Sequence, residues 1–144
     1  MDPLPGVKNK FIRNRPKDIF LEKAIVPNKD SSKTIDYHFF KDFEDNSTTS
    51  TKRINDLKNN FGRKPSSTMQ IETITTTELA KNYIGSKQIN LLNIDIEGGE
   101  LEILSDLLKA KIYPWIICVE EIGMYAESIV KDSPIYEILK QNSY

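Results

Sequence analysis

The chain has 144 residues, of which 38% are hydrophobic, and its 20 Lys and Arg nearly balance 21 Asp and Glu. This length fits one domain, and a net charge of -1 at this apolar content excludes a disordered chain. The only cysteine, Cys118, excludes an intramolecular disulfide framework. No apolar run approaches the roughly 18 residues that span a bilayer, and the scattered lysines lack interleaved aromatic residues. We therefore expect a soluble cytoplasmic protein that binds neither membrane nor nucleic acid.

The N-terminal part of the chain predicts one helix and two strands. Apolar residues near helical spacing indicate a helix over residues 5–14, and Pro16 closes it because proline disfavours helical geometry in the preceding residue. Residues 18–26 predict a strand that stops at Pro27. Residues 34–40 are rich in β-branched and aromatic side chains and predict a second strand.

A long polar segment, residues 41–68, follows and contains few apolar residues. We interpret it as an excursion from the domain with one short helix at 52–59. Serine and threonine crowd residues 46–50. We interpret this cluster as a solvated loop, with a cover over a functional site as the alternative.

The chain then returns to regular structure. Residues 69–74 alternate between apolar and polar side chains, which predicts a strand. Either Thr76 or Thr77 can cap a helix whose apolar positions continue as far as Gly85. These two elements lead into the most informative part of the sequence.

A strand, an amphipathic helix and a second strand follow within about thirty residues, which predicts a βαβ unit. Residues 89–96 are nearly continuously apolar, and so are residues 115–119. The helix between them carries a leucine stripe at Leu101, Leu104, Leu107 and Leu108. Strands that are apolar on both faces indicate a parallel sheet covered by helices, so we expect Cys118 and Trp115 in the core. A last helix is predicted over residues 134–140.

Acidic side chains follow both strands of this unit. Asp95 and Glu97 end the first strand, and Glu120 ends the second. Carboxylates at the carboxyl edge of a parallel sheet can bind ribose hydroxyls or an amine, ligate a divalent cation, or act as a general base. The alternative for Asp95 is an acid that stabilises the next helix N-terminus. We expect Gly98 and Gly99 to leave room for a ligand close to the backbone.

Other chemistries have less support in the sequence. His38 is the only histidine, and a lone histidine on a strand defines no Ser-His-Asp arrangement. Tyr125 lies just beyond the second acidic strand end and is a candidate for lining an acceptor pocket. A metal-dependent enzyme that uses Asp95, Glu97 and Glu120 as oxygen ligands is an alternative, although no histidine lies near them in the sequence.

The segment INLLNIDIEGGELEIL resembles the motif of FkbM-type methyltransferases, in which a strand ends in Asp-(Val/Ile)-Glu-Gly-x-Glu before a leucine-rich helix. Here the pattern runs from Asp95 to Glu100. The strand at 115–120 is similar to the next strand of that family, and residues 70–79 are similar to the strand and small helix before the motif. Residues 2–6 look like the acidic end of the second strand of a class I methyltransferase.

This resemblance implies an α/β fold, namely a partial Rossmann-like class I methyltransferase fold with a mostly parallel sheet flanked by helices. Residues 1–144 would form a single partial domain that starts at the end of the second strand. The first strand with its glycine-rich loop, and the final strands, have no counterpart in this sequence. As a consequence, we expect this chain to bind the cofactor weakly or not at all.

The resemblance also implies an activity and roles for individual residues. The family uses S-adenosylmethionine, often for O-methylation of a sugar or another small polar acceptor. Asp2 would bind the cofactor's ribose, and Asp95 would lie near its methionine end, with Asp95 and Glu97 as catalytic residues. From their position at and beyond the end of the second strand, we expect Glu120 and Tyr125 to bind the acceptor, and no metal is assigned. The alternative is a catalytically silent fragment or an interaction module of the same fold.

Overall fold

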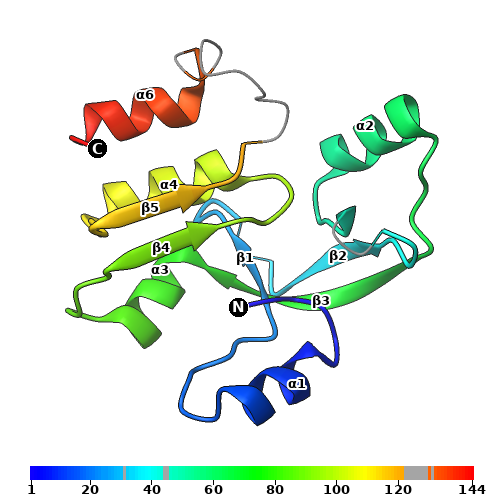
Figure 1. The fold of residues 1–144 in the computed structure, drawn as a ribbon, viewed down its shortest axis with the longest axis horizontal. Coiled ribbons are helices and arrows are strands. Elements are labelled where there is room, and N and C mark those ends of the chain that lie inside the picture. Colours follow the sequence, from blue (N-terminus) through cyan, green and yellow to red (C-terminus); the bar gives the residue numbers. More distant parts are fainter. Residues whose placement is uncertain (31, 44–45, 122–129, 131) are drawn as a thin grey trace.

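The computed structural model describes the chain except for residues 31, 44–45, 122–129 and 131, and it shows an α/β arrangement (Figure 1). The elements in chain order are α1 (Val7–Asn14), β1 (Ala24–Val26), β2 (Thr34–Phe39), α2 (Thr51–Phe61), β3 (Ser67–Thr75), α3 (Thr76–Leu79), the π-helical turn η2 (Ala80–Ile84), β4 (Leu91–Ile94), α4 (Glu100–Lys109), β5 (Ile116–Val119) and α6 (Pro134–Gln141). None of the helices in these described ranges is long and apolar enough to cross a membrane.

The first sheet has the strand order β1-β3-β2 and is mixed. Strand β1 runs parallel to β3, with Ala24 paired with Thr73, whereas β2 runs antiparallel to β3, with Thr34 paired with Glu72. The expectation of a mostly parallel sheet is therefore wrong for this half of the fold. The physical reason is the connection: the segment that carries α2 leaves and re-enters the sheet at the same end, which forces consecutive strands to pair antiparallel.

The second sheet contains β4 and β5, which are parallel and joined through α4. This confirms the strand, helix and parallel strand that the sequence predicts over residues 89–119. The leucine stripe of α4 forms the main core, in which Leu104 has no exposed surface. Ile94 of β4 and Ile135 of α6 belong to the same buried cluster, so both helices cover one face of this sheet.

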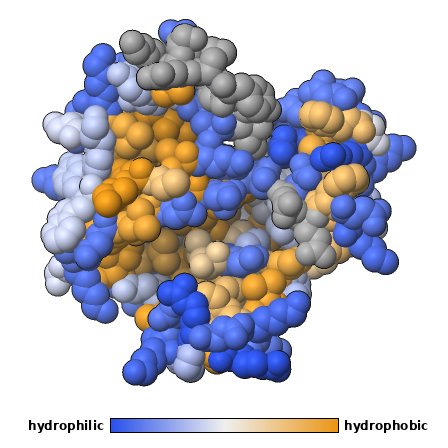
Figure 2. All heavy atoms as spheres, in the orientation of Figure 1, coloured by the Kyte–Doolittle hydropathy of each residue, from blue (hydrophilic) through white to orange (hydrophobic). Residues whose placement is uncertain are grey.

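The opposite face of β4 and β5 is bare, which corrects the prediction of a sheet covered on both sides. Leu91 is 60% exposed and Ile116 is 62% exposed, and Cys118 on the same face is also exposed. Trp115, expected in the core, is 69% exposed. Figure 2 shows hydrophobic side chains gathered over this part of the molecule. The apolar residues of these two strands therefore led to a prediction of more burial than the structure shows, because no described element packs against this face.

Several element boundaries differ from the sequence predictions. Only the end of the expected strand 18–26 is paired, because the chain before β1 turns toward the N-terminus, where the Asp2 N–H donates to the Leu21 carbonyl (3.1 Å). Helix α2 is longer than the predicted 52–59. Thr75, rather than Thr76 or Thr77, caps α3, and its side chain accepts from the Glu78 N–H in a reciprocal capping box.

Candidate active site

The two acidic strand ends meet because of the register of β4 and β5. Ile94 is paired with Val119, so the next residue of each strand, Asp95 and Glu120, leaves the sheet at the same edge. The Glu120 N–H also donates a hydrogen bond to the Ile94 carbonyl (2.9 Å). Parallel pairing thus places the two carboxylates side by side at the carboxyl edge, where open α/β sheets bind ligands.

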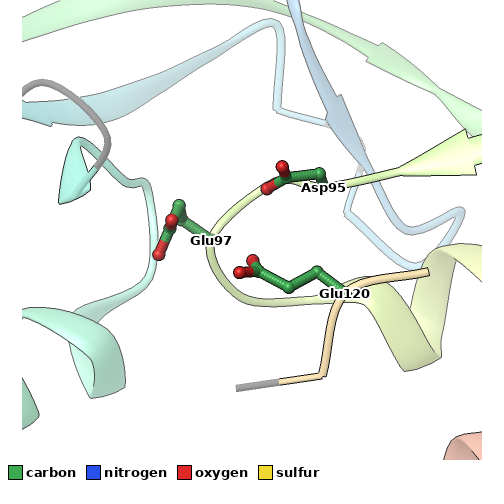
Figure 3. A group of neighbouring side chains, drawn as sticks. All are labelled: Asp95, Glu97 and Glu120. Carbon is green, nitrogen blue, oxygen red and sulfur yellow. The ribbon is translucent and has the colours of Figure 1, made fainter.

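A third carboxylate joins this pair from the turn after β4. One oxygen each from Asp95, Glu97 and Glu120 lies within 4.8 Å of the others, and Figure 3 shows Asp95 and Glu120 both extending toward the turn that carries Glu97. We call these three residues the acidic cluster. Asp95 and Glu120 are exposed and Glu97 is partly buried. The structure therefore brings together three of the site residues that the sequence predicted.

Burial and neighbouring charges raise the pKa of Glu97 and of Glu120. Desolvation of its carboxyl group raises the pKa of Glu120 to about 7, and the charges of Glu97 and Asp95 and a hydrogen bond with Asp95 contribute to the increase. Glu120 is nevertheless an exposed residue, so solvent screens part of this effect. Burial also raises the pKa of Glu97, while the nearby Arg53 guanidinium acts in the opposite direction. Negative charge is therefore costly at this site.

The turn that carries Glu97 has an unusual backbone. Glu97, Gly98 and Gly99, which we call the glycine turn, all have positive φ angles, of 56°, 120° and 113°. Glu100, at the start of α4, steadies this turn, because its carboxylate accepts hydrogen bonds from the N–H groups of Ile96 (3.2 Å) and Gly98 (2.9 Å). Glu100 is thus a buried first-turn acid that closes the loop, and its carboxylate is not part of the acidic cluster.

The space beside Gly98 is occupied by protein. A Cβ atom at this position would lie 2.9 Å from the Ser50 Cβ. The expectation that this glycine leaves room for a ligand is therefore wrong, because the Ser50 side chain fills that room. At Gly99 the nearest atom to such a Cβ would be the Ile96 Cδ1, at 3.6 Å.

Residues 46–50 are packed against the site, which corrects their interpretation as a solvated loop. Ser47 is 8% exposed and Thr48 is 1% exposed. The Thr48 hydroxyl donates to the Glu97 carbonyl (2.7 Å), and Arg53 forms an ion pair with the Glu97 carboxylate (3.1 Å). The alternative interpretation, a cover over a functional site, is the one that fits Thr48. Sequence reasoning missed Arg53 as a site residue, because it lies in a segment that was interpreted as an excursion.

Two cavities adjoin the acidic cluster. The first, of about 610 Å³, is lined by all three acids together with Asp2 and apolar side chains such as Leu4. The second, of about 630 Å³, is lined by Glu120, Arg53, Gly98 and Gly99, among others. Glu120 borders both cavities, so the acidic cluster lies between them.

The N-terminal segment also lines the first cavity. The Asp2 backbone is tied to Leu21, and one oxygen of its carboxylate accepts the Leu4 N–H at 2.8 Å. These bonds fix the orientation of Asp2 near the acidic cluster. Tyr125, the remaining predicted site residue, lies outside the described residues.

Of the comparisons with known proteins, one gives a match. Neither a curated protein nor a solved structure matches the chain. The family model described as the methyltransferase FkbM domain matches residues 3–144, which is nearly the whole sequence. The match includes the acidic strand ends, the glycine turn and the leucine-rich helix that suggested the resemblance. The chain therefore belongs to the FkbM methyltransferase domain family.

Proposed function

We propose that this chain transfers a methyl group from S-adenosylmethionine to a hydroxyl oxygen of a sugar or another small polar acceptor. The observation that carries the proposal is the position of the acidic cluster between two cavities, at the strand edge of a methyltransferase-family domain. Such a position allows one cavity to hold a methyl donor and the other an acceptor, with carboxylates at their junction.

The chemistry of the first cavity suits S-adenosylmethionine. The cofactor carries ribose hydroxyls that donate hydrogen bonds, an ammonium group and a positively charged sulfonium. The cavity offers the Asp2 and Asp95 carboxylates as acceptors and counter-charges, beside the apolar side chains of Leu4, Val7 and Ile25. When bound, the cofactor supplies an electrophilic methyl group. We assign Asp2 to the ribose and Asp95 to the methionine end.

The acidic cluster prepares the acceptor in this proposal. Glu120 accepts a hydrogen bond from the acceptor hydroxyl and orients its oxygen, while Asp95 and Glu97 provide the carboxylate that takes the hydroxyl proton. A carboxyl group removes a proton most effectively when its pKa lies near the working pH. The raised pKa of Glu97 supports this use of the cluster. Much of the rate acceleration would come from holding the two reactants in line.

Titration with S-adenosylmethionine, followed by ¹H–¹⁵N NMR up to millimolar concentration, tests this proposal and detects weak binding. We expect saturable shifts at residues 1–4, 23–25 and 95–97, which line the first cavity. Asp95→Asn should weaken binding roughly tenfold or more, consistent with loss of about 1.4 kcal/mol from a charged contact. The matched control is Glu137→Gln on the exposed side of α6, which should bind as the wild type does.

Two other outcomes of the same titration would favour other functions. An unshifted spectrum at millimolar cofactor would support the catalytically silent module instead. Three carboxylate oxygens within 4.8 Å also form a ligand set that a divalent cation accepts. Selective broadening of residues 95–97 and 120 by micromolar Mn²⁺, without any response to the cofactor, would favour the metal-dependent enzyme.

A further inference from the structure

The backbone at Glu97 has a conformation that its own side chain does not favour. Its φ angle of 56° lies in the left-handed region, where a residue with a Cβ atom is strained by about 1–2 kcal/mol. Such strain persists only where surrounding contacts hold it in place. The contacts that hold Glu97 come partly from its own loop, through Glu100, and partly from a distant segment of the chain, residues 46–53.

Thr48 provides the first contact from that segment. Its backbone N–H and C=O form a two-bond bridge with His38 of β2 (3.1 and 2.9 Å), which fixes it to the first sheet. Its hydroxyl accepts the Ser50 N–H (2.9 Å) and donates to the Glu97 carbonyl (2.7 Å). Because Thr48 is 1% exposed, water has little access to replace this bond.

Arg53 provides the second contact, this time to the Glu97 side chain. Its Nε–H donates to the Glu97 carboxylate (3.1 Å), and its Nη2 donates to the Asn46 side-chain oxygen (3.2 Å). The Arg53 and Glu97 side chains are only 18% and 17% exposed. A partly buried ion pair of this kind favours the charged form of the carboxylate, and Arg53 lowers the pKa of Glu97 against the effect of burial.

Close packing provides the third contact. Ser50 caps helix α2 by accepting the Arg53 N–H, and its side chain rests against Gly98 where a Cβ would fit only with a shift. The start of α2 is therefore seated directly on the glycine turn. Thr48 thus contacts the Glu97 carbonyl, Arg53 contacts the Glu97 carboxylate, and Ser50 packs beside Gly98.

We propose that residues 46–53 form a clamp that positions the turn at Glu97 for the proposed methyl transfer, with Thr48 and Arg53 as its positioning residues. Thr48 sets the backbone of Glu97, and Arg53 sets the direction and the charge of its carboxylate. The clamp is attached to the first sheet, whereas Glu97 extends the second. The proton-accepting carboxylate is thus held jointly by both halves of the fold. This inference rests on the proposed function for the role of Glu97.

Side-chain ¹³C NMR titration of Glu97 tests the role of Arg53. Arg53→Gln should raise the Glu97 pKa, because burial then acts without the opposing guanidinium, and Arg53→Lys should restore part of the decrease. Arg13→Gln, the same change at an exposed position of α1, is the control and should leave this pKa unaltered. A folded Arg53→Gln variant with the wild-type Glu97 pKa would overturn the inference.

Amide hydrogen exchange tests the role of Thr48. Thr48→Val keeps the side-chain shape and removes the hydroxyl, so exchange at residues 97–99 should become roughly tenfold faster, equivalent to about 1.4 kcal/mol of local stability. Thr48→Ser keeps the hydroxyl and should exchange as the wild type does, as should the exposed control Thr34→Val. Equal exchange at 97–99 in wild type and in Thr48→Val would contradict the clamp.

Neither measurement requires the cofactor, so the clamp and the proposed function can fail separately. If both clamp experiments succeed while the S-adenosylmethionine titration shows no binding, the proposed function fails and the contacts stand. If the cofactor binds while Arg53→Gln leaves the Glu97 pKa unchanged and Thr48→Val leaves exchange at residues 97–99 unchanged, the clamp fails and the proposed function stands.

Discussion

Asp95 and Glu120 lie side by side because each is the first residue beyond a strand pair in parallel register, Ile94 with Val119. Their adjacency is thus fixed by backbone pairing, and Glu97 completes the cluster from the following turn. Three carboxylates at this spacing repel one another when all are ionised. Because this repulsion is present in the folded state, the stability of the fold should depend on pH.

The stability of the chain should depend on pH through Glu120. Its folded pKa of about 7 lies above the ordinary 4.5, so the folded state binds this proton more tightly than the unfolded state does. The resulting stabilisation is present in full below about pH 4.5 and is lost as the pH rises through about 7. Glu120→Gln removes this loss, so its Tm relative to wild type should increase between pH 5 and pH 8.

The increase should be on the order of 1–2 °C, because solvent screening reduces the effect at an exposed residue. Melting curves of both proteins across that range provide the measurement. Glu137→Gln, on exposed helix surface away from the cluster, gives the background. A Tm difference that stays constant from pH 5 to pH 8 would show that Glu120 is ionised normally.

The free energy of unfolding should depend far more on the buried side chains of α4 than on the side chains of the bare face of the second sheet. Leu104 has no exposed surface, whereas Leu91 is 60% exposed. Leu104→Ala should therefore cost about 3 kcal/mol of unfolding free energy, through lost burial and a residual cavity. Leu91→Ala should change it by only about 0.5 kcal/mol. Urea denaturation of the two variants compares the same chemical change at both sites, and similar costs would contradict this account of the core.

The sequence predicted best those features that depend on local patterns. The leucine stripe of α4 identified the helix, and the apolar runs beside it identified β4 and β5. Parallel pairing of those strands then followed from the short βαβ spacing, and so did the proximity of Asp95 and Glu120. Each of these inferences needs only periodicity and the geometry of one supersecondary unit.

Features that depend on contacts between distant segments were not accessible. Nothing local to Thr48 or Arg53 indicates that each bonds to Glu97, more than forty positions later in the chain. The antiparallel pairing of β2 with β3 depends likewise on how the long connection between them returns. Gly98 appeared to make room for a ligand, since its sequence neighbours do not show that Ser50 fills the space.

The sequence also wrongly predicted that Cys118 and Trp115 are buried in the core. Their exposure makes both side chains accessible to reagents in solution. Cys118 lies between apolar neighbours in the sequence, but its side chain is exposed on the face that no described element covers. The thiol should therefore react fully with a soluble disulfide reagent in the native protein, without denaturant. Emission of the exposed Trp115 should likewise be quenched by iodide. A native thiol that reacts only after urea is added would show that this face is covered in solution.

A side chain at position 98 should lower the stability of the fold for two separable reasons. The φ of 120° at Gly98 is unfavourable for any residue with a Cβ atom, and that Cβ would meet Ser50 at 2.9 Å. Gly98→Ala should therefore destabilise the fold by about 2–4 kcal/mol, combining backbone strain with overpacking. Gly62→Ala is the matched control, because Gly62 also has a positive φ, of 66°, but open space beside it. It should cost only about 1 kcal/mol.

A double variant separates the two contributions at Gly98. Ser50→Gly removes the opposing Cβ, and glycine at a helix N-cap costs only a few tenths of a kcal/mol. Adding Ser50→Gly to Gly98→Ala should therefore recover about 1 kcal/mol or more of the lost stability, which leaves the backbone strain in place. Denaturation of the two single variants and the double variant measures this coupling. If the two substitutions are simply additive, Ser50 does not press on the turn, and the close seating of α2 on the candidate site is wrong.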